Sequence, residues 1–117
     1  MKLIIAGGRD FNDYNLLKEK LDHLLSKLPN DDIEIVSGCA RGTDSLGERY
    51  AKEKGILVKQ FPAKWGQYGK RAGYLRNEEM ALYSTHCICF WDGESKGTKH
   101  MIDISKKQNL NLRIVRY

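Results

Sequence analysis

Short apolar runs alternate along this chain with longer segments in which apolar residues recur every three or four positions. The short runs are rich in Ile, Val, Leu and Phe with few polar positions between them, which is typical of strands covered on both faces. They predict strands at residues 3–6, 33–37, 57–61, 87–91 and 112–115. The longer segments predict helices at residues 15–28, 43–54, 72–83 and 98–108.

The strict alternation of strands and helices predicts an α/β fold of three layers, in which helices cover both faces of a five-stranded parallel sheet. We predict one domain over residues 1–117 and the strand order 3-2-1-4-5, which places the first and fourth strands at the centre. In such sheets, ligands bind beyond the carboxyl ends of the strands, where the direction of winding changes. The longest connection, 62–71, is rich in Gly, Lys and aromatic residues, which is typical of a functional loop.

Glycine-rich segments follow three of the predicted strands, at 7–10, 37–44 and 92–98. All three lie at the same edge of the sheet, and two lead directly into a helix, whose first amides are unpaired and lie at the positive end of the helix dipole. We therefore predict a phosphate site at this edge. Its predicted binding residues are Gly7, Gly8, Arg9, Asp10, Ser37, Gly38, Arg41, Gly42, Thr43, Asp92, Gly93, Ser95, Gly97 and Thr98. Thr43 and Thr98 can either cap their helices or donate to phosphate oxygens, and both roles stay open.

The 62–71 connection and the helix after it add candidates for the same site. Trp65 or Tyr68 can stack on a base, although Trp65 can equally pack the loop onto the domain. Arg76 is predicted either to serve the site or to pair with Glu79 along its own helix. The other predicted binding residues in this region are Lys70, Arg71 and Asn77.

Composition and charge narrow the class of protein. Of the 117 residues, 41% are hydrophobic and 30% charged, as in ordinary globular domains. The net charge of +5 suits a polyanionic partner, from a nucleotide to DNA. No apolar run approaches the roughly 20 residues that cross a bilayer, so we predict a cytoplasmic protein without membrane contact. Cys39, Cys87 and Cys89 lack the spacing of a zinc site and are predicted to be buried free thiols, with no metal or other cofactor.

Two common nucleotide-binding motifs are missing from the glycine-rich segments. None reads G-x-x-x-x-G-K-[ST], the loop that holds phosphate in P-loop proteins. None reads G-x-G-x-x-G, and the second predicted strand ends in Ser37 instead of the acid that would hold the ribose of NAD. The predicted site therefore differs from both types.

Four motifs occur in order along the chain: Gly7-Gly8-Arg9-Asp10-Phe11, Ser37-Gly38-x-Ala40-Arg41-Gly42-x-Asp44, Arg76-Asn77-x-x-Met80 and Asp92-Gly93-x-Ser95-x-Gly97-Thr98. They resemble the SLOG superfamily of Rossmann-like nucleotide-binding domains, above all its small YspA/YpsA-related group, common in bacteria and phages. The superfamily also includes the DNA-processing protein DprA and the Lonely Guy phosphoribohydrolases, and other members sense nucleotide signals. The resemblance implies a SLOG-like nucleotide-binding domain that forms a homo-oligomer.

Catalysis is an open alternative. Lonely Guy enzymes carry P-G-G-x-G-T-x-x-E, and the position of its glutamate corresponds to Met101 in this chain. A thioether neither stabilises an oxocarbenium ion nor activates water, so cleavage of an N-glycosidic bond by that route is disfavoured. An enzyme would need another carboxylate, for which Asp10, Asp44 and Asp92 are the candidates, and we predict Asp44, with Arg76, as its catalytic pair. Asp44 can instead have a structural role in the first turn of its helix.

Three functions follow from these observations. The first is a module that senses, carries or sequesters a phosphorylated nucleoside or a small molecule derived from a nucleotide. The alternative is a nucleoside monophosphate phosphoribohydrolase or a related N-glycosidase. The third is a DprA-like partner of single-stranded DNA, ranked last because the chain lacks the extra domains of that family and has no dense basic stripe.

Overall fold

Five parallel strands form the central sheet in the computed structural model, which describes residues 1–117. They are β1 (Lys2–Gly7), β2 (Glu34–Ser37), β3 (Leu57–Gln60), β4 (His86–Trp91) and β5 (Asn111–Arg116). The strand order is β3-β2-β1-β4-β5, which confirms the order predicted from the sequence. Ile4 of β1 pairs with Val36 of β2 on one side and with Cys87 of β4 on the other, so β1 and β4 lie together at the centre.

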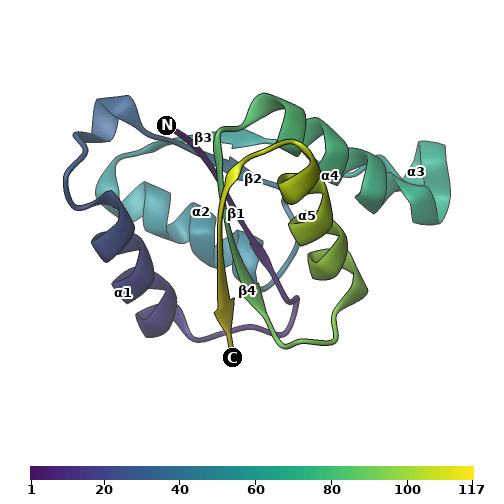
Figure 1. The fold of residues 1–117 in the computed structure, drawn as a ribbon, viewed down its shortest axis with the longest axis horizontal. Coiled ribbons are helices and arrows are strands. Elements are labelled where there is room, and N and C mark those ends of the chain that lie inside the picture. The colour runs from purple at the N-terminus through teal and green to yellow at the C-terminus, as the bar shows by residue number, and fades with distance from the viewer.

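Helices cover both faces of the sheet, as Figure 1 shows. On one face lie α1 (Tyr14–Leu25) and α2 (Thr43–Lys54), and on the other lie α4 (Ala72–Tyr83) and α5 (Lys96–Lys107). The connection after β3 contains the short helix α3 (Trp65–Tyr68) and the 3₁₀ turn η2 (Gly69–Arg71), and a second 3₁₀ turn, η1 (Asn30–Asp32), precedes β2. None of the helices is long and apolar enough to cross a membrane.

Alternate residues of β1 point to opposite faces of the sheet and enter two separate apolar clusters. Leu3 and Ile5 pack against α1 and α2, whereas Ile4 and Ala6 pack against α4 and α5. Because both faces of this strand are buried, its sequence is apolar without alternation.

The prediction that every strand is covered on both faces is wrong for the two edge strands. In β5 only Leu112 and Val115 are partly buried, and β3 departs further from the prediction. All of its residues are exposed, and 75% of the surface of Leu57 is accessible. β3 is an edge strand that pairs only with β2. The helices pack mainly on the more central strands, so an apolar sequence at the edge does not imply burial.

The prediction that all three cysteines are buried is wrong for Cys39. Cys87 and Cys89 are buried free thiols in β4, but the free thiol of Cys39 is exposed. Cys39 follows the end of β2 and has a φ of 63°, so it belongs to the turn beyond the sheet. Its side chain has no helix packed over it for that reason.

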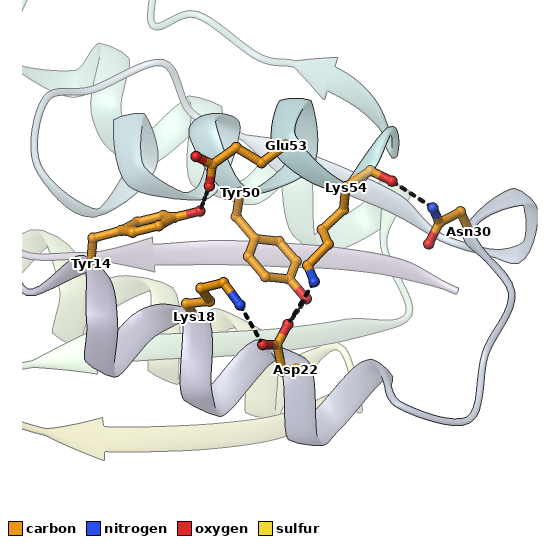
Figure 2. A network of polar contacts seen from close by, with 7 residues as sticks. All are labelled: Tyr14, Lys18, Asp22, Asn30, Tyr50, Glu53 and Lys54. Atoms are coloured by element: carbon orange, nitrogen blue, oxygen red, sulfur yellow. Dashed lines mark hydrogen bonds and ion pairs between the residues drawn. The ribbon is translucent and has the colours of Figure 1, made fainter.

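Polar side chains join α1 to α2 (Figure 2). Asp22 of α1 accepts a hydrogen bond of 2.8 Å from the hydroxyl of Tyr50 and lies 3.5 Å from Nζ of Lys54, both on α2. Tyr14 of α1 donates from its hydroxyl to Glu53 of α2. These contacts hold α2 in place, and the first turn of α2 reaches the carboxyl edge of the sheet.

Candidate functional site

A cavity of about 690 Å³ opens at the carboxyl end of β1, between the loop after β2 and the helices α4 and α5. We call it the main cavity. The three glycine-rich segments and the connection after β3 all contribute to its wall. The predicted site residues that line it are Gly7, Gly8, Arg9, Asp10, Arg41, Asp44, Trp65, Lys70, Arg76, Asn77, Ser95, Gly97 and Thr98.

The remaining predicted site residues do not line the main cavity; they are Ser37, Gly38, Gly42, Thr43, Arg71, Asp92 and Gly93. Ser37 is buried and donates from Oγ to Oε2 of Glu48 at 2.5 Å. Thr43 is also buried and donates from Oγ1 to the carbonyl oxygen of Gly8 at 3.0 Å. The hydroxyl of Thr43 therefore neither caps α2 nor faces the cavity, but joins two of the glycine-rich segments.

The start of α5 is organised by Asp92 and Ser95. Oδ1 of Asp92 accepts hydrogen bonds of 2.8 Å from the amides of Glu94 and Ser95. Oγ of Ser95 accepts from the amide of Thr98 at 3.5 Å, so Ser95 caps the helix and α5 begins at Lys96. The predicted start at residue 98 is wrong because Ser95, and not Thr98, is the capping residue. Thr98 is left to line the cavity.

Two glycines of the three segments, Gly7 and Gly42, are required by the packing of the protein's own backbone. A Cβ at Gly42, whose φ is 76°, would lie 2.5 Å from the carbonyl oxygens of Gly8 and Arg9. Gly97 differs, since a Cβ there would have no heavy atom within 4 Å and its backbone is helical. Glycine in the middle of a helix costs about 0.5–1 kcal/mol relative to alanine, which is an upper bound for Gly97 in the first turn of α5. Nothing within the protein requires glycine at position 97, whereas close approach of a ligand to its backbone would.

Arg76 of α4 lies half-buried between the loop after β2 and the main cavity. It donates from Nη1 to the carbonyl oxygen of Gly38 and from Nε to Oδ1 of Asn77 at 3.0 Å. The predicted alternative of a pair with Glu79 is absent, and Arg76 forms no ion pair within 4 Å. Burial lowers the pKa of Arg76, because the charge is poorly solvated.

Asn77 connects α4 to α5. It is 6% exposed, and its Nδ2 donates to the carbonyl oxygen of Gly97 at 3.4 Å and lies 3.2 Å from Nδ1 of His100. The ring of His100 packs edge-on against Tyr74, with 4.6 Å between the ring centroids. His100 and Tyr74 were not predicted from the sequence, because neither lies in a glycine-rich segment. The only sequence feature that places them near the site is their position on α4 and α5, within one helical turn of predicted site residues.

Asp44 lies in the first turn of α2 with 7% of its surface exposed. Its Oδ2 accepts a hydrogen bond of 3.1 Å from the amide of Ala40. Burial raises the pKa of Asp44 to about 6, although the amide of Ala40 and the charge of Arg76 oppose that shift. A carboxyl group that lines a cavity and titrates near neutral pH is suited to transfer protons.

The rim of the main cavity carries Trp65, which has 49% of its surface exposed. A Cβ at Gly73 would lie 3.3 Å from its ring, and the guanidinium carbon of Arg9 lies 5.7 Å from its ring centroid. Tyr68, the other candidate for stacking, does not line the cavity. Trp65 and Tyr74, which also lines the cavity, are thus the aromatic residues that a bound base can reach.

Three apolar residues, none of them predicted to form a wall of the site, complete the lining of the cavity. Ala6, Met80 and Met101 line the cavity, and both methionines are almost fully buried. Their helical spacing is equally that of core residues, so the pattern gave no sign of a second role. Met101 therefore lines the cavity with a thioether where a related enzyme has a glutamate. Elsewhere in the structure, no group of His, Cys, Asp or Glu side chains is arranged to hold a metal ion.

Comparisons with known proteins agree with this architecture. The family model described as YspA, cpYpsA-related SLOG family matches residues 1–68. The Gene 61 protein of Mycobacterium phage D29 is 31% identical over 115 residues, which cover 93% of this chain and 91% of that protein. DNA processing protein A of Helicobacter pylori, solved in a study of its single-stranded DNA binding, has a similar fold, with a TM-score of 0.71 at 20% identity. That similarity covers 97% of this chain but 64% of the DNA processing protein.

Proposed function

Because the chain belongs to the YspA, cpYpsA-related SLOG family, we propose that residues 1–117 act as one nucleotide-binding domain that holds a phosphorylated nucleoside in the main cavity. The observation that carries this proposal is the guanidinium of Arg76, which is half-buried and has no carboxylate within 4 Å. Asp44 is the acid that acts on this charge, but the two side chains form no ion pair, and a bound phosphate would supply a direct counter-ion to the half-buried guanidinium.

The start of α5 supports a position for the phosphate. The amides of the first helical turn lie at the positive end of the helix dipole, and Ser95 occupies only that of Thr98. Gly97 lines the cavity without a side chain to keep a ligand away from its amide. Arg76 lines the same cavity, and Asn77 joins it to Gly97 by hydrogen bonds. A phosphate at this point would therefore meet an amide and a guanidinium together.

The base and ribose have a separate part of the cavity. Ala6, Met80 and Met101 offer an apolar wall, and thioethers make favourable contacts with aromatic rings. Trp65 at the rim offers a face for stacking. An apolar lining with a few placed charged groups is typical of small-molecule sites, and it suits a nucleotide.

Thermal-shift measurements with a panel of nucleoside mono- and diphosphates test the proposal. At least one nucleotide is expected to raise the melting temperature, and Arg76→Ala is expected to abolish that increase. Arg71→Ala is the matched control, since Arg71 is exposed and does not line the main cavity. The proposal is wrong if no nucleotide stabilises the wild-type protein, or if Arg76→Ala responds as Arg71→Ala does.

Binding of single-stranded DNA is a second candidate. The fold similarity to a DNA processing protein that binds single-stranded DNA favours it, as does the net charge of +5. Because contacts to phosphates release counter-ions, such binding would weaken steeply between 50 and 200 mM salt. A gel-shift assay with a single-stranded oligonucleotide at low salt decides the question, and no shift would remove this candidate.

A further inference from the structure

A second cavity of about 550 Å³ adjoins the main cavity, on the side of the loop after β2. The two cavities share the residues Arg9, Ala40, Arg41, Trp65 and Arg76. Four further residues line the second cavity and not the main cavity: Gly38, Cys39, Pro62 and Ala63. The shared residues form the boundary between the two cavities, so a ligand at this boundary has access to both.

Positive charge is concentrated at this boundary. Arg9, Arg41 and Arg76 line both cavities, and none of them forms an ion pair. The second cavity has no acidic residue in its wall, whereas Asp10 and Asp44 line the main cavity. Besides the start of α5, the boundary is therefore a second favourable position for an anion, away from these two acids.

The second cavity is larger than a phosphate group requires. Small-molecule sites have volumes of roughly 300–1,000 Å³, and each of the two cavities falls within that range by itself. Pro62, Ala63 and the ring of Trp65 give the second cavity an apolar part of its own. This lining suits a sugar or a base more than a second phosphate.

We propose that the second cavity is a second nucleoside subsite, and that the ligand consists of two nucleosides joined through phosphate. The linking phosphate lies at the boundary, on Arg9, Arg41 and Arg76, with one nucleoside in each cavity. The link is either a phosphodiester, as at an oligonucleotide end, or a pyrophosphate. This inference rests on the proposed function, because it places the first nucleoside in the main cavity.

Calorimetric titrations with a graded series of adenine compounds test the inference. AMP and ADP each carry one nucleoside, whereas adenylyl-adenosine and diadenosine pyrophosphate carry two. One of the two-nucleoside compounds is expected to bind at least about tenfold more tightly than AMP, which corresponds to roughly 1.4 kcal/mol. It is also expected to bind more tightly than ADP, although ADP carries more charge. If adenylyl-adenosine gives the higher affinity, the ligand is an oligonucleotide end. If diadenosine pyrophosphate gives it, the ligand is a dinucleotide joined by pyrophosphate.

Variants that fill the second cavity measure its contribution to binding separately from that of the main cavity. Ala63 is half-buried and lines only the second cavity, so Ala63→Trp is expected to remove the gain while leaving the affinity for AMP unchanged. Ala63→Leu is a smaller change that keeps the test valid if the larger variant fails to fold. Gly66→Ala is the matched control on the same connection, because a Cβ there has no heavy atom within 4 Å.

Two results would overturn the inference while the proposed function stands. One is ADP binding as tightly as, or more tightly than, both two-nucleoside compounds, since the second cavity would then hold only charge. The other is a gain that persists in folded Ala63→Trp and Ala63→Leu. If neither AMP nor ADP binds, nor any member of the panel of nucleotides, the proposed function itself fails, and the inference fails with it.

Discussion

The Nε atom of Arg76 donates a hydrogen bond of 3.0 Å to Oδ1 of Asn77, the next residue along α4. The other end of the guanidinium is held by the carbonyl oxygen of Gly38, in the loop after β2. Asn77 is buried and is in turn bound to Gly97 at the start of α5. The orientation of the arginine therefore depends on two neighbouring elements and not on its own helix alone.

Replacing Asn77 tests that dependence. Asn77→Leu keeps the volume of the side chain but removes the acceptor from Arg76, and a hydrogen bond to a charged group contributes roughly 1.5–3 kcal/mol. We expect nucleotide affinity to fall at least about tenfold in a calorimetric titration. Glu78→Ala, at the next and exposed position of α4, is the control and is expected to bind as wild type does. Equal affinities in the two variants would show that Asn77 does not position Arg76.

Gly97→Ala is expected to change stability and nucleotide binding in opposite directions. A Cβ at this position, the second residue of α5, meets no atom of the protein, so the unliganded variant should be more stable by up to about 0.5–1 kcal/mol. The same methyl group should hinder close approach of a phosphate and weaken nucleotide binding. Chemical denaturation and calorimetry measure the two effects. Gly66→Ala also adds a methyl group in open space, and it should leave binding unchanged. Undiminished affinity in Gly97→Ala would remove the ligand from this position.

Stability should depend on pH through Asp44. Its pKa is about 6 in the folded protein, against 3.8 for an ordinary aspartate. Between these values the folded protein binds more protons than the unfolded chain, so the free energy of unfolding decreases as pH rises from about 4 to about 6. The decrease is on the order of 3 kcal/mol, and above pH 6 the contribution stays constant.

Urea unfolding of the wild type and of Asp44→Asn between pH 4 and pH 8 measures this contribution, because the other titrating groups are common to both proteins. We expect the stability of the wild type relative to the variant to fall as pH rises, and the variant to be the more stable protein at pH 7. Parallel curves across this range would contradict a raised pKa at Asp44.

The contacts between α1 and α2 should affect stability without affecting the site (Figure 2). Tyr50→Phe removes the hydroxyl that donates to Asp22 at 2.8 Å, and we expect a loss of about 1 kcal/mol in the free energy of unfolding. Nucleotide affinity should be unchanged, because neither residue lines the main cavity. If affinity falls by more than the unfolded fraction of Tyr50→Phe explains, the contact between Tyr50 and Asp22 also affects Asp44 through α2.

The sequence was sufficient to predict the sheet and its order. Residues buried on both faces of a central strand must all be apolar, so β1 and β4 are recognisable without further information. β3 has the same kind of sequence but lies exposed at the edge, because burial there depends on how far the helices extend across the sheet. How far the helices extend depends on tertiary packing, so it cannot be predicted from the local sequence of the strand.

The site was predicted less completely than the fold. Glycine-rich segments at strand ends indicate a location, so Gly7, Gly97 and Arg76 could be assigned to one cavity. Ser37 and Thr43 belong to the same segments but point into the protein, which depends on the local turn of the chain. Met80 lies in one of the four motifs and Met101 at the position of a related enzyme's glutamate, but their spacing is equally that of core residues, so the apolar wall that they form was not predicted.

The measurement that tests the central claim most directly is the nuclear magnetic resonance spectrum of the backbone amides during titration with the nucleotide that gives the largest thermal shift. We expect saturable changes at the amides of Gly8, Gly97 and Thr98, together with the side-chain Nε of Arg76, and little change along β3. Changes confined to other surfaces, with the amide of Gly97 unmoved at saturation, would contradict a phosphate site at the start of α5.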